Sequence, residues 1–176
     1  FVVKSKKVFS MEDMKKEMIK HKDKSLTIVA LEGVENPHNI GAICRVCANF
    51  DVNYVLIDKK ISVQNASVIR TAEGGFESLN FIQCENIYQS LKDFKEAGFR
   101  IISTSSHVGR PIQKLIPFEK NIVVFGSEKD GISQDVMKLS NLYISIPSSG
   151  NVESLNVSCA ASVILYEMWN KREVLK

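Results

Sequence analysis

Residues 144–169 have the sequence ISIPSSGNVESLNVSCAASVILYEMW, in which a short apolar strand, a polar loop and a helix follow one another. The apolar residues of the last part recur at spacings of three and four, which predicts a helix with one broad buried face. They are Val157, Ala160, Ala161, Ile164, Leu165 and Met168. Ser154 and Asn156 come just before this face, where either side chain could cap the helix. The loop offers more donors and acceptors than a cap needs, so it also predicts a ligand beside the start of the helix.

Six apolar segments have the length and composition of buried strands, and they alternate with helical patterns. The expected strands are 26–31, 54–57, 79–83, 99–104, 121–125 and 142–146. The expected helices are 11–22, 38–50, 63–71, 87–97, 133–139 and 156–172. Because the strands are apolar on both sides, the sequence predicts an α/β fold with a mostly parallel sheet that helices cover on both faces.

Polar loops follow four of the expected strands. They begin after Leu31, Thr104, Phe125 and Ile146, and each contains glycine. Ligands collect at the carboxyl ends of parallel strands, so we expect these loops to meet at one edge of the sheet. The sequence contains neither G-x-G-x-x-G nor G-x-x-x-x-G-K-[ST], which removes the usual support for a dinucleotide site or a P-loop.

The chain of 176 residues is 44% hydrophobic, which is enough for one domain with a sizeable core. Residues 1–24 hold eight Lys against four acids, whereas the rest of the chain is close to neutral. The sequence therefore divides into a basic N-terminal segment, 1–24, and a domain of residues 25–176. The Lys side chains suit contacts with nucleic-acid phosphates, although Lys is also common on any solvated helix face.

The apolar runs are too short to span a bilayer and no leader with a cleavage site is visible, so we expect a soluble, cytoplasmic protein with no membrane partner. Cys44 and Cys47 form a single Cys-x-x-Cys pair, which lacks a second pair and lies on the apolar face of the helix 38–50. Small core residues in a reducing compartment explain this pair better than a zinc or redox site, and no metal is expected.

The helix expected at 38–50 has an unusual second face. Small residues surround a single Arg45 there, whereas Lys and Glu would cover an ordinary solvated face. This predicts that another subunit or a substrate packs closely against the face and that Arg45 reaches it. The alternative is an ion pair between Arg45 and a nearby acid such as Glu32 or Glu35.

Three motifs lie at these positions in a fixed order. The first is Asn39-x-Gly-x-x-x-Arg45, and the second is V-F-G-S-E-x-x-G-I-S, which contains Glu128. The third is I-P-x-x-G-x-x-x-S-L-N-V-S, which contains Ser154 and Asn156. Together, over residues 26–172, they resemble the motifs of the SpoU (TrmH-type) RNA 2'-O-methyltransferases of the SPOUT superfamily. The sequence RTAEGG at 70–75 also resembles a subset of that family.

The resemblance implies an α/β fold whose C-terminal part forms a trefoil knot, one of the rare exceptions to unknotted topology. It also implies that S-adenosylmethionine binds in the knot and that the protein works as a homodimer with the active site at the interface. Catalytic or site-building roles are implied for Asn39, Arg45, Glu128, Ser154 and Asn156. Cofactor-binding roles are implied for Thr104, Gly126, Ile146, Ser154 and Leu155.

The implied activity is methyl transfer from S-adenosylmethionine to a ribose 2'-hydroxyl of RNA. Ribosomal RNA is preferred to tRNA, because no long basic extension follows the last helix. Arginine stays protonated and has no lone pair to offer, so phosphate binding and stabilisation of the developing alkoxide suit Arg45 better than the role of a base. The alternatives are a catalytically silent RNA-binding or assembly factor on the same fold and, less well supported, a nucleotide-binding domain of unrelated chemistry.

Three positions depart from the family pattern. Asp51 stands where Gly is common after the helix, Lys129 where Gly is usual in the second motif, and Ser148 where Met often follows the proline. We expect Asp51 to be a variation of the turn. Lys129 and Ser148 are expected beside the cofactor site, where they could alter cofactor affinity.

Overall fold

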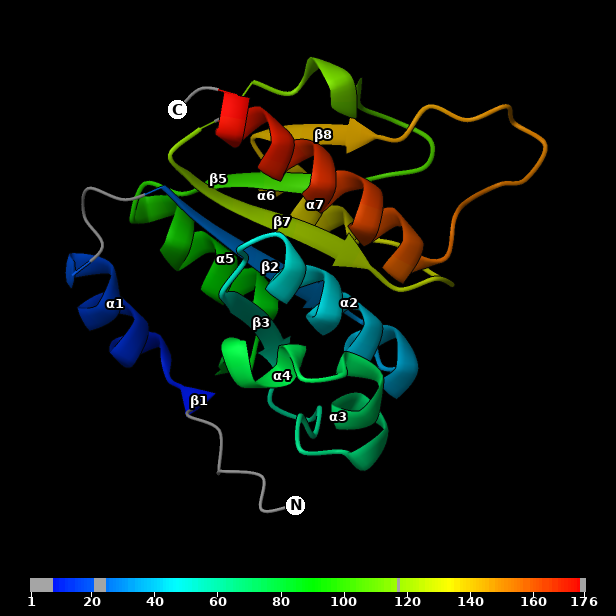
Figure 1. Ribbon diagram of the computed structural model, residues 1–176. Helices are drawn as coiled ribbons and strands as arrows, with labels where there is room; N and C mark the ends of the chain where they lie inside the picture. Colours follow the sequence, from blue (N-terminus) through cyan, green and yellow to red (C-terminus); the bar gives the residue numbers. More distant parts are fainter. Residues whose placement is uncertain (1–7, 21–24, 117, 175–176) are drawn as a thin grey trace.

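The computed structural model describes residues 8–20, 25–116 and 118–174, and Figure 1 shows how they are arranged. The strands are β1 (Val8–Phe9), β2 (Leu26–Glu32), β3 (Tyr54–Asp58), β4 (Asn80–Cys84), β5 (Arg100–Thr104), β6 (Arg110–Pro111), β7 (Lys120–Gly126) and β8 (Leu142–Ser145). The helices are α1 (Met11–Lys20), α2 (Pro37–Asn49), α3 (Ala66–Ala72), α4 (Gly75–Ser78), α5 (Ile87–Glu96), the 3-10 helix η1 (Ile112–Lys114), α6 (Gln134–Leu139) and α7 (Val157–Val174).

The described strands form one sheet in the order β1-β4-β3-β2-β7-β5-β8-β6, and every pairing within it is parallel. The longest pairing lies at the centre, where β2 and β7 stay in register from Leu26 and Lys120 to Glu32 and Gly126. One buried cluster contains side chains of α2, α3, α4 and α7, and a second cluster contains side chains of α1, α5 and α6. The prediction of a parallel sheet with both faces covered is therefore confirmed (Figure 1).

Short elements account for most differences from the sequence prediction. The two-residue strands β1 and β6 are too short to produce a periodic pattern, and α4 is a single turn. β1 pairs with β4, and Phe9 and Met14 are buried in the second cluster. The described part of the Lys-rich segment therefore packs on the sheet. The helix predicted at 11–22 ends at Lys20, and its last two positions lie outside the described residues.

Capping residues set the starts of the helices that carry the motifs. Asn36 caps α2 by accepting hydrogen bonds from the backbone N–H groups of His38 and Asn39, so α2 begins at Pro37, one residue earlier than predicted. Asn65 caps α3 in the same way, and the helix predicted at 63–71 begins three residues later. The last helix begins at Val157, because Asn156 is its cap and not its first helical residue.

The C-terminal part of the sheet is threaded. β8 pairs with β5 on one side and with β6 on the other, so the chain that leaves β5 must cross β8 to reach β6. Gly109 makes this crossing, and a Cβ there would lie 2.8 Å from both the carbonyl carbon and the carbonyl oxygen of Tyr143. Further along, after β8, the chain forms a long loop and returns as α7, which packs beside α2 (Figure 1). This threading is what the expected knot requires.

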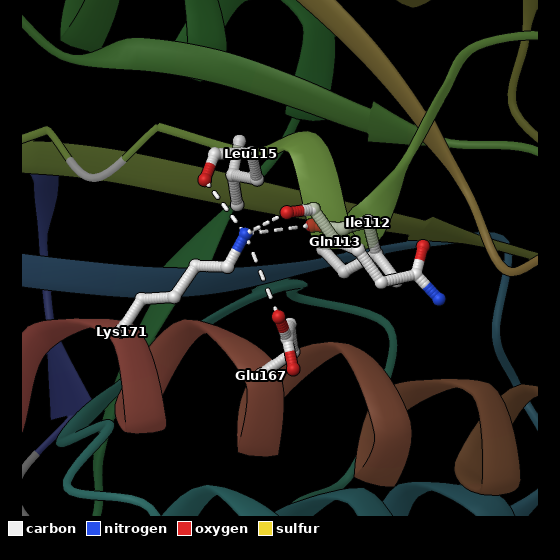
Figure 2. A network of polar contacts seen from close by, with 5 residues as sticks. All are labelled: Ile112, Gln113, Leu115, Glu167 and Lys171. Carbon is white, nitrogen blue, oxygen red and sulfur yellow. Dashed lines mark hydrogen bonds and ion pairs between the residues drawn. The ribbon is translucent and has the colours of Figure 1, made fainter. Parts of the chain in front are cut away.

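Lys171 joins α7 to η1, the helical turn that follows β6. Figure 2 shows its Nζ atom among three backbone carbonyls, and it donates to Ile112 at 3.2 Å, to Leu115 at 2.9 Å and to Gln113. Its fourth partner is the Glu167 carboxylate, 3.5 Å away and one turn earlier in the same helix. Lysine has three protons to donate, so this ammonium suits a group of carbonyls at the end of η1. The Ile112 carbonyl also accepts from the Leu115 N–H at 3.0 Å.

The two cysteines of the Cys-x-x-Cys pair are both fully buried, which confirms their assignment to the core. Burial raises the pKa of the Cys44 thiol to about 12 and raises that of Cys47 well above its usual value, so both stay protonated and unreactive at neutral pH. Among the described residues, no helix combines the length and the apolar composition needed to cross a membrane.

Candidate active site

Asn156 is the centre of a polar network that joins three distant parts of the chain. Its side-chain N–H group donates to Asn39 Oδ1 at 3.1 Å and to a carboxylate oxygen of Glu128. Its Oδ1 accepts from the backbone N–H of Ser158 at 2.9 Å and from the Ser158 hydroxyl at 2.6 Å. One side chain therefore caps α7 and holds two other candidate residues, and these partners fix which end of the amide is the donor.

Asn39 and Glu128 reach Asn156 because their elements end at the same edge of the sheet. Asn39 lies in the first turn of α2, which follows β2, and Glu128 lies in the loop after β7, the neighbour of β2. This edge is the carboxyl edge of parallel strands, where loops from separate βα units converge. The structure thus brings Asn39, Glu128 and Asn156 together, as their places in the sequence led us to expect.

A pocket of about 570 Å³ lies beside this network. Its walls come from the loops after β5, β7 and β8 and from the first turns of α7, over residues 104–107, 125–132, 146–148 and 152–155 with Met137, Val157, Ala160 and Ile164. All the residues expected to bind a cofactor line it: Thr104, Gly126, Ile146, Ser154 and Leu155. Glu128 lines the pocket and also bonds Asn156, so network and pocket are continuous.

The loop after β7 is held in a tight turn. The Gly131 N–H donates to the Ser127 carbonyl at 3.0 Å, and the Asp130 N–H donates to the Ser127 hydroxyl at 3.0 Å. A Cβ at Gly126 would lie 2.2 Å from the carbonyl carbon of Gly131, so only glycine fits where the turn closes. Glu32, from the neighbouring β2, accepts from the backbone and the hydroxyl of Ser133. These bonds fix the wall that carries Glu128.

Arg45 lies apart from this network within one chain. It is six residues beyond Asn39 in α2, which is about 9 Å along the axis of a helix and on a different side of it. Its Nη1 atom lies 2.9 Å from a carboxylate oxygen of Glu73, and Arg45 does not line the pocket. The alternative of an ion pair between Arg45 and a nearby acid is therefore confirmed, although the acid is Glu73 and not one of the suggested examples, Glu32 and Glu35. The Glu32 carboxylate accepts from Ser133 instead.

The small residues of α2 pack partly against the same chain. A Cβ at Gly41 would lie 2.6 Å from the Thr71 Cβ in α3, and one at Gly75 in α4 would lie 3.1 Å from the Ala48 Cβ. For Gly41 and Ala48, the expectation that a subunit or substrate covers this face is wrong, because α3 and α4 cover it. Arg45 and Asn49, in contrast, remain exposed.

Two acidic residues take part in pairings that the sequence analysis did not predict, although Glu73 lies in the RTAEGG segment. Glu73 ends α3 and precedes two glycines, a pattern typical of a helix that turns sharply. Glu153 lies in the loop after β8, and its carboxylate is 3.6 Å from His107 Nε2 in the loop after β5, so the two side chains face each other at the pocket. Neither pairing could be predicted from sequence spacing.

The departures from the family pattern have different surroundings. Asp51 has a left-handed backbone with φ +56°, the conformation that favours glycine, so the residue is a variation of the turn as expected. Its carboxylate accepts from the Asn53 side chain at 3.2 Å. Lys129 and Ser148 both line the pocket, together with the residues expected to bind a cofactor.

Fold and site together define a threaded α/β domain with a ligand-sized pocket beside a polar network. Comparison with known proteins gives the family. Residues 26–166 match the SpoU rRNA Methylase family, and the chain belongs to that family. Its α/β fold is accordingly the knotted SPOUT fold.

A similar protein, "Uncharacterized tRNA/rRNA methyltransferase YfiF" of Escherichia coli O157:H7, is 37% identical over 146 residues, which are 83% of this chain and 42% of that protein. A TrmH family relative from Staphylococcus aureus (strain COL) is 34% identical over 154 residues, 87% of this chain and 62% of the relative. The chain thus spans less than two thirds of the length of both relatives.

Solved structures support the same family. The TrmH/SpoU tRNA modifying enzyme of A. aeolicus superposes with a TM-score of 0.77 at 28% identity, and the match covers 94% of this chain and 85% of that one. The SpoU methyltransferase AviRb of Streptomyces viridochromogenes, solved in complex with AdoMet, has a TM-score of 0.78 at 23% identity and coverages of 86% and 62%. At that identity the second likeness supports the fold alone.

Proposed function

We propose that this chain is the catalytic domain of an S-adenosylmethionine-dependent methyltransferase that modifies a ribose 2'-hydroxyl of rRNA or tRNA. The observation that carries the proposal is the continuity between the pocket and the Asn39–Asn156–Glu128 network. Mere binding of RNA requires no such arrangement of amides and a carboxylate at the mouth of a pocket. Membership of the SpoU rRNA Methylase family is consistent with this function. We place the reaction in the cytoplasm as part of the proposal.

The pocket fits S-adenosylmethionine in size and chemistry. A volume of about 570 Å³ lies within the usual range of cofactor sites. Phe125, Ile146, Leu155 and Ile164 offer apolar contacts for the adenosine, and Glu128 and Glu153 offer negative charge to a cationic sulfonium and ammonium. When bound, the cofactor supplies an electrophilic methyl group on sulfur.

The residues of the chain supply alignment and electrostatics. Methyl transfer is an in-line displacement by the ribose 2'-oxygen, and holding the reacting atoms in line removes much of the barrier. Asn156 keeps Asn39 and Glu128 at the pocket mouth, where their remaining polar groups can position the ribose. Arg45 binds an RNA phosphate and stabilises negative charge as it develops on the 2'-oxygen, while the proton leaves to water or to a nearby acceptor.

A homodimer would complete this site. Arg45 and the pocket do not meet within one chain, and two copies related by a twofold axis could bring Arg45 of one subunit to the pocket of the other. Large apolar side chains of α7 and the loop before it are exposed and suit such an interface: Val152, Leu155, Val163 and Tyr166.

The first test is Arg45→Ala. Because Arg45 lies outside the pocket, the variant should bind S-adenosylmethionine within about twofold of wild type while transfer falls by about 100-fold to 1000-fold, as for loss of one transition-state donor. Labelled methyl transfer to RNA and calorimetry measure the two quantities. Lys92→Ala, which removes one exposed positive charge from α5, is the control and should transfer normally. Transfer by Arg45→Ala within a few-fold of wild type contradicts the assignment.

Mixing two inactive variants tests the dimer. If Arg45 and Asn156 act in one site from different subunits, a mixture of Arg45→Ala and Asn156→Ala should regain about a quarter of the wild-type activity, since half of the dimers then hold one intact site. No recovery in a mixture shown to exchange subunits would reject the interfacial site. Wild-type protein that binds RNA but transfers no methyl group to any of it would instead favour the silent RNA-binding factor.

A further inference from the structure

The ion pair between Arg45 and Glu73 is exposed, which limits what it can contribute to stability. The side chains are 57% and 62% exposed, and the Nη1–oxygen distance is 2.9 Å. Exposed pairs of this kind contribute little to stability, because water screens the attraction and two long side chains must be ordered. The pair therefore affects the orientation of Arg45 more than it affects the fold.

The chain around Glu73 brings its carboxylate directly to the turn of α2 that carries Arg45. Gly74, with φ +84°, follows Glu73, and a Cβ at Gly75 would lie 3.1 Å from the Cα of Arg45. A Cβ at this distance would be a tight contact, so glycine favours this approach between the start of α4 and α2. Residues 73–75 thus lie against α2, and the position of Glu73 relative to Arg45 follows from backbone contacts.

The helix before Glu73 is fixed against α2 as well. Gly41 of α2 packs on α3 so closely that a Cβ would lie 2.7 Å from the Val68 carbonyl oxygen. The Thr71 hydroxyl donates to the Ser67 carbonyl at 2.8 Å and lies 3.4 Å from His38 Nδ1 in α2. Val68 and Ala72 are buried between the helices and the sheet. The carboxylate therefore extends from a rigid support.

Glu73 occupies a backbone conformation that does not favour it. Its φ and ψ are +44° and +55°, the left-handed region, which is unfavourable for a residue other than Gly, Asn or Asp. Glycine or asparagine would cap α3 at a lower cost. What Glu adds at this position is a carboxylate within bonding distance of Arg45.

We propose that Glu73 is a positioning residue that orients the guanidinium of Arg45 for the reaction. The carboxylate binds one edge of the guanidinium, and the remaining N–H groups stay free to bind the RNA phosphate and the developing alkoxide. A free arginine side chain otherwise loses rotamer entropy when it binds, because it must be ordered at that moment. This inference rests on the proposed methyl transfer and adds a residue to it.

Glu73→Gln tests the proposal, because it keeps the size of the side chain and removes the charge. We expect kcat for methyl transfer to RNA to fall by about 10-fold to 30-fold, with the KM for S-adenosylmethionine unchanged, since the lost orientation acts at the transition state. The affinity for RNA should not fall, because the variant loses a negative charge that repels phosphate. Glu73→Asp should recover part of the lost kcat.

Glu85→Gln is a matched control. Glu85 forms an ion pair with Lys59. The Glu85 side chain is 81% exposed and that of Lys59 is 53% exposed, and neither residue lines the pocket. This variant loses the same charge and a similar bond, and it should keep wild-type kcat. Equal kcat values for the two Gln variants would overturn the proposal, and so would a rise in kcat for Glu73→Gln, which would mean that Glu73 restrains the enzyme.

A second measurement separates this proposal from the proposed function. The ¹⁵N relaxation of the Arg45 Nε–H group, assigned with Arg45→Lys, should show an ordered side chain in wild type and a mobile one in Glu73→Gln. If wild type transfers no methyl group, the proposed function fails, and relaxation still decides whether Glu73 holds Arg45. Equal mobility in the two proteins overturns the positioning role.

Discussion

The two polar clusters of this domain are assembled in different ways. Asn39, Glu128 and Asn156 come from widely separated parts of the chain and meet only where the parallel strands end. Arg45 and Glu73 belong to α2 and to the end of α3, helices that pack on each other directly. The first cluster therefore depends on the whole fold, including the threaded part, whereas the second depends on one helix pair.

Because of this difference, substitutions in the two clusters should affect folding and chemistry differently. Asn156 both caps α7 and bonds Asn39 and Glu128, so a change there affects folding and chemistry together. The Arg45–Glu73 pair is exposed and joins no core residue, so a change there should affect the chemistry and leave the fold intact. Substitutions chosen in each region can separate these contributions.

Asn156→Ala should have the largest effect. It removes the donor that holds Asn39 and Glu128, and we expect transfer to fall by about 100-fold or more, as for loss of a fixed polar group in an active site. It also removes the cap of α7, which should lower the free energy of unfolding by about 1 kcal/mol. Transfer assays at a temperature where the variant is folded, and urea denaturation, measure the two effects.

Asn86→Ala is the matched control for this change. Asn86 caps α5 by accepting from the Gln89 N–H at 3.0 Å, and it does not line the pocket. It should cost a similar amount of stability, about 1 kcal/mol, with transfer unchanged. If Asn156→Ala loses only as much transfer as Asn86→Ala, then Asn156 is a cap and the network has no part in the reaction.

The sequence predicted the first cluster better than the second for a physical reason. Parallel strands of similar length place the loops after them at one edge, so motifs that follow strands must converge, and Asn39, Glu128 and Asn156 do. Contacts between helices depend instead on how closely two backbones approach. Gly41 and Gly75 permit such an approach, but a glycine alone does not tell which partner it faces.

Local sequence patterns could not predict the threading of the chain either. β6 is two residues long and makes no periodic signal, although its place outside β8 is what makes the chain cross β8. Only the resemblance of the motifs implied this topology. The structure explains why a glycine, Gly109, stands at the crossing, because any side chain there would meet the backbone of β8.

Lys171→Met should have the second largest effect, now on stability in the threaded part. The variant keeps the length of the side chain but leaves three carbonyls and Glu167 without the ammonium, which is only 20% exposed. Loss of hydrogen bonds to a charged group should lower the free energy of unfolding by about 2 kcal/mol. Thermal or urea unfolding measures this value.

The control is Lys114→Met, which removes an exposed ammonium from the same segment and should change stability by less than about 0.5 kcal/mol. Lys171 lies near the end of α7 opposite to Asn156, so cofactor binding should persist in folded Lys171→Met protein. A variant that is as stable as wild type would show that water replaces the ammonium at these carbonyls.

Asp51→Gly should have the smallest effect, and it sharpens the comparison between the two regions. Asp51 and Glu73 are the described residues other than glycine with positive φ, +56° and +44°. Glycine removes the conformational cost of the left-handed backbone but gives the unfolded chain more freedom. We therefore expect the free energy of unfolding, measured by urea denaturation, to rise by at most about 1 kcal/mol, with methyl transfer unchanged. The hydrogen bond to Asn53 that the variant loses is exposed and should contribute little.

Glu73→Gly should gain as much stability and still lose kcat, because only Glu73 holds a group of the proposed site. If both glycine variants keep full transfer, the left-handed glutamate is a turn variation like Asp51, and Arg45 needs no partner to act.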